Sequence, residues 1–501
     1  MAARLETDLT ILASDDFEGR EAGTEGYDAA ASYLVHEFRK IGLKPAGENG
    51  RFLQPVPLRR AYAVDRDAAM SIDGDQLILH GDYITLPAPD AVKARVTGEL
   101  VFVGYGVDAL RFNMRSYCDI DVEGKIVVFL RGTPPGLPSE EAAHLNKLTT
   151  KMAAAAEAGA IGAIVASPTD ASTDRGRARM MREARRVDHR WIAPPEAAAD
   201  IQPRAMLTRS GTEKLLAGTG IDIDALFAGQ VSARPLGKMA TLETRSRYED
   251  YTSANVMAMI EGSDPSLRDE AIVLSAHLDH IGKLNAIDED RDLINNGAMD
   301  NASGIAILLE VARRFAAADA PPRRSVVFAA VTAEERGLLG SDYLAQFPPA
   351  ALPKMVANVN LDMPILLHDF TDVIAFGAAH STLTDIVADA AAAEGVSITP
   401  DPVPEMALFV RSDHYSFVKA GVPSVFLFLG FDNGGEESFR NFMNTHYHQP
   451  SDQPDLPIRY DVGARFAALN AAIAAALANA DAAPAWHEGD FFGETFGLSK
   501  P

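Results

Sequence analysis

Short apolar segments alternate with helical ones between residues 253 and 430, and this alternation limits the fold more than any other feature. Strands are predicted at "SANVMAMIEG", "AIVLSAHL", "SVVFAAVT", "MVANVNLDM", "DVIAFG" and "PSVFLFLG". Helices are predicted at "SGIAILLEVARRFAAA", "ERGLLGSDYLAQF", "TLTDIVADAAAAEG" and "SDHYSFVKAG". Such a pattern is typical of a mostly parallel sheet covered by helices on both faces. We therefore predict an α/β fold in which ligands collect at the carboxyl ends of the strands.

The chain of 501 residues is long enough for two or three domains. Residues 1 to about 60 are predicted to be helical, chiefly through "TEGYDAAASYLVHEFRKIGLKP", where Gly42 is a stop signal. Short β-type runs such as "GKIVVFLRG" then surround an alanine-rich helix. We expect residues 1–89 to be the N-terminal part of the main domain, residues 90–240 a small inserted β-rich domain, and residues 241–501 the rest of the main domain. The arginine-dense "TDRGRARMMREARRVDHR" is interpreted as solvated surface.

Composition limits the classes of partner. The net charge of −24 repels phosphate backbones and anionic membrane surfaces, so neither nucleic acid nor a membrane is expected to bind. No stretch approaches the roughly 20 continuous apolar residues of a membrane span, and the N-terminus shows no signal-peptide pattern. The single cysteine, Cys118, rules out an intramolecular disulfide, and we interpret it as a packing residue rather than a nucleophile.

Histidines and carboxylates follow the predicted strands at five separate places. They are His277, Asp279, Asp300, Glu334, Glu335, Asp362 and His448. Each of them alone has an ordinary explanation, such as a helix cap, but that explanation does not account for all five places together. Two histidines with several carboxylates and no cysteine suit zinc, and also cobalt or manganese. Since Glu334 and Glu335 are neighbours, one can bind a metal while the other acts as a general base.

Five motifs in this order carry a family resemblance: "HLDHIG", "GAMDNASG", "TAEERGLLGS", "NLDM" and "HYHQPSD". They resemble the di-zinc M28 peptidases, and residues 90–240 are similar to the protease-associated domain inserted in these enzymes. The resemblance implies that His277, Asp300 and Asp362 hold one zinc ion. It implies that Asp300, Glu335 and His448 hold a second, with Asp300 bridging. It also implies a cis peptide bond between Asp300 and Asn301.

The resemblance further implies that Glu334 is the general base and acid. Tyr447 resembles a donor to the oxyanion in some members, although an aromatic wall of the pocket is an equal interpretation. From the strand geometry we expect the Asp279 carboxylate to receive the second ring N–H of His277, and His280 to point away from the metals.

The remaining site predictions concern the pocket and one acidic loop. "RSDHYSF" resembles a substrate-side element, so Arg411, Asp413 and His414 are candidate pocket residues, while Ser412 is expected to cap the following helix. The surplus acids Asp288, Glu289, Asp290 and Asp292 form either a solvated loop or a site for a further cation such as calcium.

We expect a zinc-dependent exopeptidase acting on peptide substrates. The leading hypothesis is an aminopeptidase that works through a metal-bound hydroxide with Glu334 as base. A carboxypeptidase or dipeptidase is the alternative, but it needs basic residues to hold a carboxylate, and Arg411 is the only one near the motifs. Glutaminyl cyclases resemble this fold too, usually without the inserted domain. A non-catalytic binding module is a remote alternative, because every ligand position is intact. By family analogy the protein is exported; side-chain preference and oligomeric state stay open.

Overall fold

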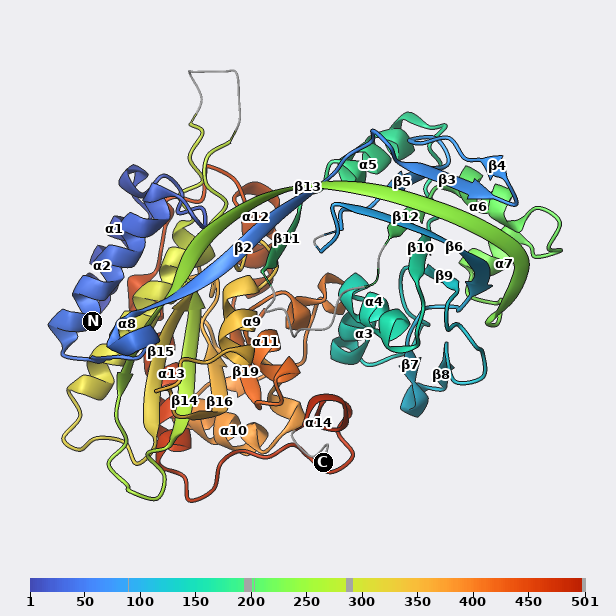
Figure 1. The fold of residues 1–501 in the computed structure, drawn as a ribbon. Helices are drawn as coiled ribbons and strands as arrows, with labels where there is room; N and C mark the ends of the chain where they lie inside the picture. The colour runs from blue at the N-terminus through green and yellow to red at the C-terminus, as the bar shows by residue number, and fades with distance from the viewer. Residues whose placement is uncertain (89, 193–200, 202, 285–291, 498–501) are drawn as a thin grey trace. The chain divides into compact units, whose positions relative to one another are not determined.

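The computed structural model describes residues 1–88, 90–192, 201, 203–284 and 292–497 (Figure 1). The chain forms two compact units, one of residues 1–57 with 251–501 and one of residues 58–250. Two strands, β2 (Leu53–Ala63) and β13 (Arg234–Ile260), each continue from one unit into the other. The second unit therefore starts at Leu58, earlier in the chain than the boundary at residue 90 that we predicted.

The first unit is built on a mixed sheet whose middle strands are parallel. Its order is β1-β13-β15-β14-β16-β19-β17-β18, in which β15, β14, β16 and β19 run parallel to one another. The bounds are β1 Lys44–Pro45, β14 Glu270–His277, β15 Ser325–Val331, β16 Lys354–Asn360, β17 Asp372–Phe376, β18 Ser397–Ile398 and β19 Ser424–Leu429. All six strands predicted for this region are confirmed, as is the α/β class. Because β14, β15, β16 and β19 are parallel, their carboxyl ends meet at one edge.

Helices cover the sheet of the first unit on both faces (Figure 1). Helices α1 (Ala2–Leu12), α8 (Ser303–Ala316) and α13 (Tyr460–Asn479) pack on one another, and α8 and α13 also contact β14. Helices α9 (Leu339–Gln346) and α11 (His414–Lys419) pack together, and α11 contacts β16 and β19. The other helices of this unit are α2 Glu25–Ile41, α10 Leu383–Ala393, α12 Gly435–Thr445 and α14 Phe491–Phe496.

The N-terminal region is only partly helical. Helix α2 begins at the predicted place, where the Thr24 hydroxyl accepts the Tyr27 N–H, and it ends at Gly42 with φ 90°. The prediction of helix up to about residue 60 is wrong beyond that point, because β1 and β2 follow. In β2 every second residue from Gln54 to Leu58 is buried, the period of a strand.

Helix α13 is apolar and long enough to cross a membrane by length and composition. Of its most apolar window, 61% is buried inside the protein. Its contacts with α1, α8 and α10 make it the core helix of the first unit.

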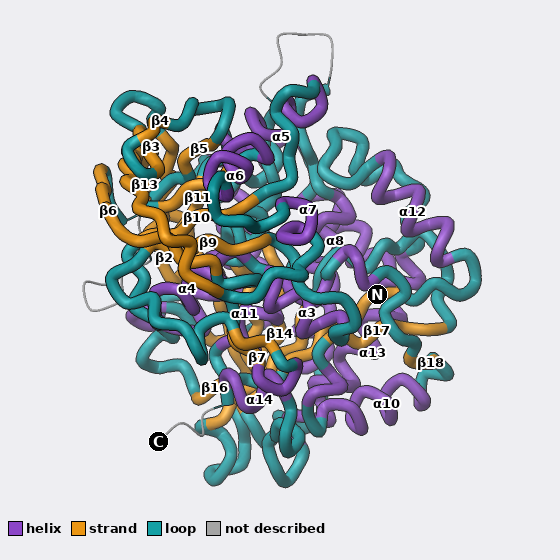
Figure 2. The backbone as a smooth tube through the Cα atoms, turned by 90° about the vertical axis from the view of Figure 1, so that its right-hand side faces the viewer, coloured by secondary structure: helices purple, strands orange, loops and turns teal. Residues whose placement is uncertain are grey.

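The second unit contains its own sheet, whose strands are drawn in orange in Figure 2. Its order is β5-β12-β10-β9-β6-β13-β3-β4, and its central strands β12, β10, β9 and β6 are parallel. The bounds are β3 Ala69–Ile72, β4 Asp75–Gln76, β5 Tyr83–Thr85, β6 Lys93–Phe102, β9 Ile126–Leu130, β10 Gly162–Ala166 and β12 Arg204–Leu207. Strand β11 (Asp188–Trp191) pairs with β2, and β7 (Asp108–Ala109) pairs with β8 (Met114–Arg115).

Both faces of this second sheet are buried. Alternate residues of β9 enter two different apolar clusters: Ile126 and Val128 lie in one, and Val127 and Phe129 lie in the other. The helices of the unit are α3 Ser139–Asn146, α4 Leu148–Glu157, α5 Asp174–Ala184, α6 Arg209–Leu216 and α7 Ile223–Phe227. The β-rich insertion with helices of its own is therefore confirmed.

A buried ion cluster joins the N-terminal helices to α8. The guanidinium of Arg313 donates to Asp8 Oδ2 at 2.6 Å and to Glu37 Oε2 at 2.8 Å, and both carboxylates are buried. We predict that Arg313→Met lowers the free energy of unfolding by about 3 kcal/mol. Asp8 and Glu37 both lose the cation between them, although Tyr33 still donates to Asp8 and Lys40 still pairs with Glu37. Denaturant unfolding measures this loss. Arg459→Met removes an exposed partner of Asp461 and is the control, with an expected loss below about 1 kcal/mol; equal losses in the two variants would contradict the account.

Candidate metal centre

The carboxyl edge of the first sheet brings the five predicted metal ligands together. His277 is the last residue of β14, while Glu335 and Asp362 follow β15 and β16. Asp300 lies in the turn Ala298–Ala302 directly before α8, and His448 follows α12. Parallel strands carry their side chains to one edge, and the two remaining ligands come from loops that end beside it.

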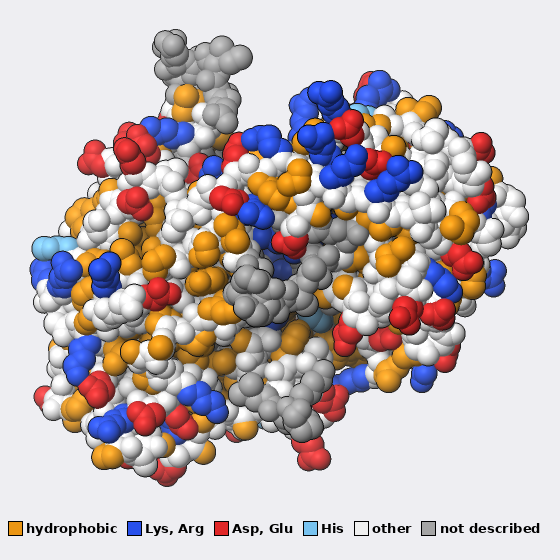
Figure 3. Space-filling model, viewed as in Figure 1, with side chains coloured by type: hydrophobic (Ala, Val, Ile, Leu, Met, Phe, Trp, Pro, Cys, Tyr) orange, Lys and Arg blue, Asp and Glu red, His pale blue; other side chains and the backbone are white. Residues whose placement is uncertain are grey.

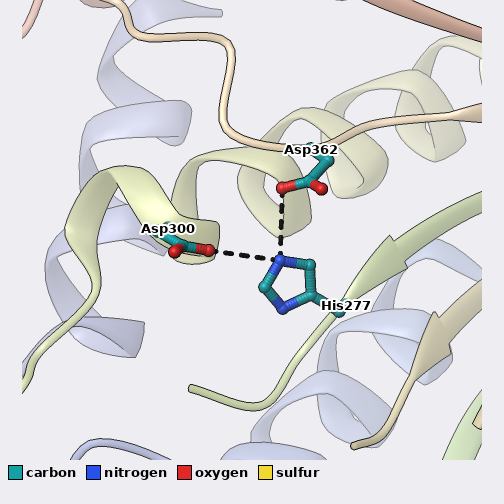
Figure 4. A group of neighbouring side chains, drawn as sticks. All are labelled: His277, Asp300 and Asp362. Atoms are coloured by element: carbon teal, nitrogen blue, oxygen red, sulfur yellow. Dashed lines mark hydrogen bonds and ion pairs between the residues drawn. The ribbon is translucent and has the colours of Figure 1, made fainter. Parts of the chain in front are cut away.

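The two histidines contact the two oxygens of one aspartate. His277 Nε2 lies 3.2 Å from Asp300 Oδ1 and 3.2 Å from Asp362 Oδ1 (Figure 4). His448 Nε2 lies 3.2 Å from Asp300 Oδ2 and 3.2 Å from Glu335 Oε2. One group of predicted ligand atoms therefore lies beside Asp300 Oδ1, and a second group lies beside Asp300 Oδ2.

These separations fit the geometry of metal ligands. Ligand atoms at about 2.0–2.1 Å from a tetrahedral zinc ion lie about 3.3 Å from one another. One ring N–H cannot donate to two carboxylates at once with good geometry, yet both His277 and His448 face two carboxylate oxygens at equal distances. Histidine and carboxylate donors without cysteine suit zinc. The residues present therefore fit two zinc ions that share Asp300.

The negative charge gathered at the site also favours the binding of cations. Five buried residues in and around it carry carboxyl groups, namely Asp279, Asp300, Asp362, Asp413 and Asp452, and the half-buried Glu334 and Glu335 add two more. Burial raises the pKa of Asp279 to about 6 and the pKa of Asp413 to about 7. Burial also raises the pKa of Glu334, and repulsion from Glu335 and Asp362 adds to that rise. Metal cations would relieve this concentration of negative charge.

Backbone contacts hold the loop that carries Asp300. The carboxylate of Asp452 accepts the N–H groups of Met299 at 2.9 Å and Asp300 at 3.1 Å. The Asp300–Asn301 peptide bond is cis, as expected. Gly297 has φ 57°, and a Cβ there would lie 2.2 Å from the carbonyl oxygen of Asp300. Only glycine fits at this position. We had quoted Asp452 within "HYHQPSD" without giving it a role.

Arg20 reaches the same loop from the N-terminal segment. Its buried guanidinium donates to the carbonyls of Asn296 at 2.6 Å and Gly297 at 2.9 Å. It also donates to Leu278 O at 3.0 Å, directly after the ligand His277. One arginine thus ties two ligand-bearing segments to the start of the chain.

The prediction for Asp279 is wrong in detail. The ring atom Nδ1 of His277 lies 3.0 Å from the backbone carbonyl of Asp279, which accepts its N–H. The Asp279 carboxylate instead accepts the backbone N–H groups of Glu334 at 3.1 Å and Glu335 at 3.3 Å. Strand β14 ends at His277, so the rule that residues two apart share a face does not extend to Asp279.

His280 lies inside the site, contrary to our expectation. It is fully buried, and its Nδ1 lies 2.7 Å from Glu335 Oε1 and 3.9 Å from Asp300 Oδ2. Together these three residues could hold a metal ion. The 2.7 Å separation is that of a hydrogen bond, whereas His448 keeps the longer ligand-like distance to Glu335. We therefore interpret His280 as a hydrogen-bond partner of the ligand Glu335.

Ser412 does not cap the helix that follows it. Helix α11 begins without a side-chain cap, and the Ser412 hydroxyl donates to Asp362 Oδ2 at 2.5 Å. Asn360 Nδ2 donates to Ser412 Oγ at 2.6 Å, and Asn360 Oδ1 accepts from Ser275 at 2.6 Å. A chain of buried polar groups therefore fixes the carboxylate of Asp362.

A cavity opens onto the predicted metal ligands. Glu334, Arg411 and Tyr447 line it on the polar side, and Leu408, Phe426, Phe428 and Met443 form an apolar wall. Arg411 Nη2 donates to the Tyr447 hydroxyl at 3.1 Å. The ring of Tyr447 stacks on that of His448, with 3.9 Å between the centroids.

The prediction that Asp413 or His414 lies at the rim of the pocket is wrong. Both are fully buried and neither lines the cavity. The chain turns inward at the start of α11, where the His414 ring packs between Phe409 at 5.2 Å and Phe426 at 5.3 Å. His414 therefore supports the apolar wall from behind.

Part of the acidic loop lies outside the described residues, namely Asp288, Glu289 and Asp290. Asp292 accepts a hydrogen bond from Gln453 Nε2 at 2.6 Å.

We predict that Asp279→Asn lowers the affinity for zinc by about 10–100-fold. The amide keeps one acceptor but turns its NH₂ group toward a backbone N–H, which disturbs the segment that carries Glu335. Competition with a chromophoric chelator measures the affinity. Asp385→Asn, at an exposed position of α10, is the control. An unchanged affinity in the Asp279 variant would contradict this role.

Zinc binding is predicted to release protons and to strengthen as the pH rises. Although burial opposes it, contacts with Asp300 and Glu335 raise the pKa of His448 to about 10, and contacts with Asp362 and Asp300 raise the pKa of His277 well above its usual value. Both rings are thus protonated near neutral pH without metal, and coordination requires neutral imidazole. Titration calorimetry in buffers of different ionisation enthalpy measures the protons released. Zinc binding without proton release between pH 6 and 8 would contradict this prediction.

Comparisons with known proteins agree with the geometry. A family model described as Peptidase family M28 matches residues 255–474, and the PA domain model matches residues 96–193. A probable zinc metalloprotease of Pyrenophora teres f. teres is 40% identical over 108 residues, which are 22% of this chain and 22% of that protein. Aminopeptidase NAALADL1 of Mus musculus is 31% identical over 137 residues, which are 26% of this chain and 16% of that protein. The matches thus span less than a quarter of the length of these relatives.

One solved structure shares the fold along nearly the whole chain. It is the aminopeptidase from Aneurinibacillus sp. strain AM-1, with a TM-score of 0.51 and 19% sequence identity over 96% of this chain and 95% of that one. The chain therefore contains an M28 peptidase domain, residues 255–474, and a PA domain, residues 96–193.

Proposed function

We propose that this protein is an aminopeptidase that holds two zinc ions and removes N-terminal residues from peptides. One observation carries the proposal. Asp300 presents one oxygen to His277 and Asp362 and the other to His448 and Glu335, all at ligand-like separations. The family supports zinc and peptide substrates, and the names of the relatives support an aminopeptidase.

Glu334 is proposed as the general base and acid. When bound, the zinc ions lower the pKa of a water molecule and polarise the substrate carbonyl. Glu334 lines the cavity beside the ligands, and Asp279 fixes its backbone. Its carboxylate takes the proton of the attacking water and then gives it to the amine that leaves. Burial raises the pKa of the Glu334 carboxyl group, and this matches the double role. Once the group has taken a proton, it can hold it until the leaving amine accepts it.

Tyr447 is proposed to stabilise the oxyanion that develops on the carbonyl. Burial raises the pKa of its hydroxyl, so the hydroxyl stays protonated and can donate. Arg411 donates to the same oxygen, which polarises the Tyr447 O–H and orients it.

The charges around the cavity favour an amine over a carboxylate as the terminal group of the substrate. Among the described residues, Arg411 is the only basic side chain that lines the cavity, and it already bonds to Tyr447. Apart from the proposed zinc ions, a terminal carboxylate would therefore find one cationic side chain, which already donates to Tyr447. Of the carboxylates that line the cavity, that of Glu334 is the one outside the proposed zinc ligands, and a terminal amine can donate to it.

Cleavage of aminoacyl-nitroanilides that stops on chelation of zinc tests the proposed activity. The same substrates with an acetylated amine should not be cleaved. Release of C-terminal residues from peptides with blocked amines would instead support the carboxypeptidase alternative and overturn the aminopeptidase proposal.

We predict that Glu334→Gln lowers kcat by at least about 10²–10⁴-fold. Glutamine keeps the shape of the side chain but cannot accept the proton of water. Metal analysis of the variant serves as its control, because the zinc content should equal that of the wild type. A variant with full zinc content and more than about a tenth of the wild-type kcat would show that Glu334 is not the base.

A further inference from the structure

Arginines gather along α5 in the second unit. Arg175, Arg179 and Arg182 follow at the spacing of one helix face, Arg186 lies two residues beyond the last residue of the helix, and the side chains of all four are exposed. Figure 3 shows Lys and Arg side chains concentrated over this part of the unit. Positive and negative residues are nearly equal in number in residues 58–250, so nearly all of the net charge of −24 belongs to the other unit.

The folded chain does not account for these arginines. Within the described ranges, none of the four side chains makes an ion pair or a hydrogen bond. The electrostatics of the helix explain only some of them, because a cation stabilises the C-terminal end of a helix and destabilises its first turn, where Arg175 lies. Like charges at this spacing also destabilise a helix. These four arginines, called the arginine stripe below, therefore lower the stability of α5. Among the described residues they have no partner that would offset this loss.

A cavity lies directly beside the arginine stripe. It is lined by Arg179, Met180 and Glu183 of α5, together with Arg131, Ser167 and Thr169. Glu183 pairs with Arg131 at 3.4 Å, which leaves the guanidinium of Arg179 as the unengaged charge at the cavity.

We propose that α5 and this cavity bind an acidic peptide segment of another protein. One acidic side chain of the partner enters the cavity against Arg179, and further carboxylates pair with Arg175, Arg182 and Arg186. Guanidinium groups recognise carboxylates through paired hydrogen bonds, so three at helical spacing on α5, with Arg186 just beyond its end, fit a run of Asp and Glu.

An acidic peptide fits this surface better than a membrane does. A helix that binds membranes also exposes large apolar side chains next to its basic ones. On α5 the large apolar side chains are those of Met180, which is buried, and Met181, which is half-buried.

Fluorescence anisotropy with the full-length protein tests the proposal. The probe is a fluorescein-labelled Glu-rich peptide, acetylated at its N-terminus and amidated at its C-terminus so that no exopeptidase cleaves it. Its analogue with glutamine in place of glutamate measures binding without charge. We expect the Glu peptide to bind, the Gln peptide not to bind, and the affinity to fall as the salt concentration rises.

Two matched triple variants locate the surface. Arg179→Gln, Arg182→Gln and Arg186→Gln together should weaken binding by at least about tenfold. Glutamine favours helices, and the change removes repulsion, so α5 should still form. The control removes the same charge at three other exposed arginines of this unit, by Arg66→Gln, Arg115→Gln and Arg234→Gln, and should leave the affinity unchanged.

Four results would overturn the proposal. They are equal binding of the Glu and Gln peptides, an unchanged affinity in the α5 variant, an equal loss in the control variant, and tighter binding of an oligonucleotide or of anionic phospholipid vesicles than of the Glu peptide. If thermal unfolding shows that the triple variant is destabilised, Arg179→Gln alone provides the measurement. It should weaken binding by about threefold, and an unchanged affinity would again overturn the proposal.

Discussion

The position of Asp300 between two imidazoles is the constraint on which the rest of the site depends. Its oxygens lie 3.2 Å from His277 Nε2 and 3.2 Å from His448 Nε2, so one carboxylate is shared by two groups of ligands. Although burial opposes it, hydrogen bonds from both rings hold the pKa of Asp300 well below its usual range. A carboxylate that stays ionised while buried among other acids requires positive charge on both sides. The sheet supplies His277 at a strand end, and a distant loop supplies His448.

Much of the support for the ligands acts on the backbone and not on their side chains. Asp452 accepts backbone N–H groups of the Asp300 loop, and Asp279 does the same for Glu334 and Glu335. Arg20 donates to carbonyls on two of these segments. Because carboxylates bond strongly to backbone N–H groups when buried, these contacts fix segments that have no regular secondary structure. They also explain why the start of the chain folds with the first unit.

The sequence predicted that His277, Glu335 and Asp362 lie close together because each stands at the end of an apolar strand, and the ends of parallel strands converge wherever the sheet forms. It failed where a contact depends on the path of the chain after the strand. Asp279 lies beyond the end of β14, so strand periodicity assigned it the wrong partner. Ser412 and Asp452 bond to segments far away in the chain, which local patterns do not reveal. In β2 a buried residue at every second position was present but was interpreted as helix.

X-ray scattering at the zinc absorption edge, from crystals of the zinc-loaded protein, tests the central claim most directly. The account predicts two anomalous peaks about 3.5–4 Å apart, with the carboxylate of Asp300 between them. One peak should lie beside His277 and Asp362 and the other beside His448 and Glu335. A single peak, or two peaks of which one does not contact Asp300, would contradict the account.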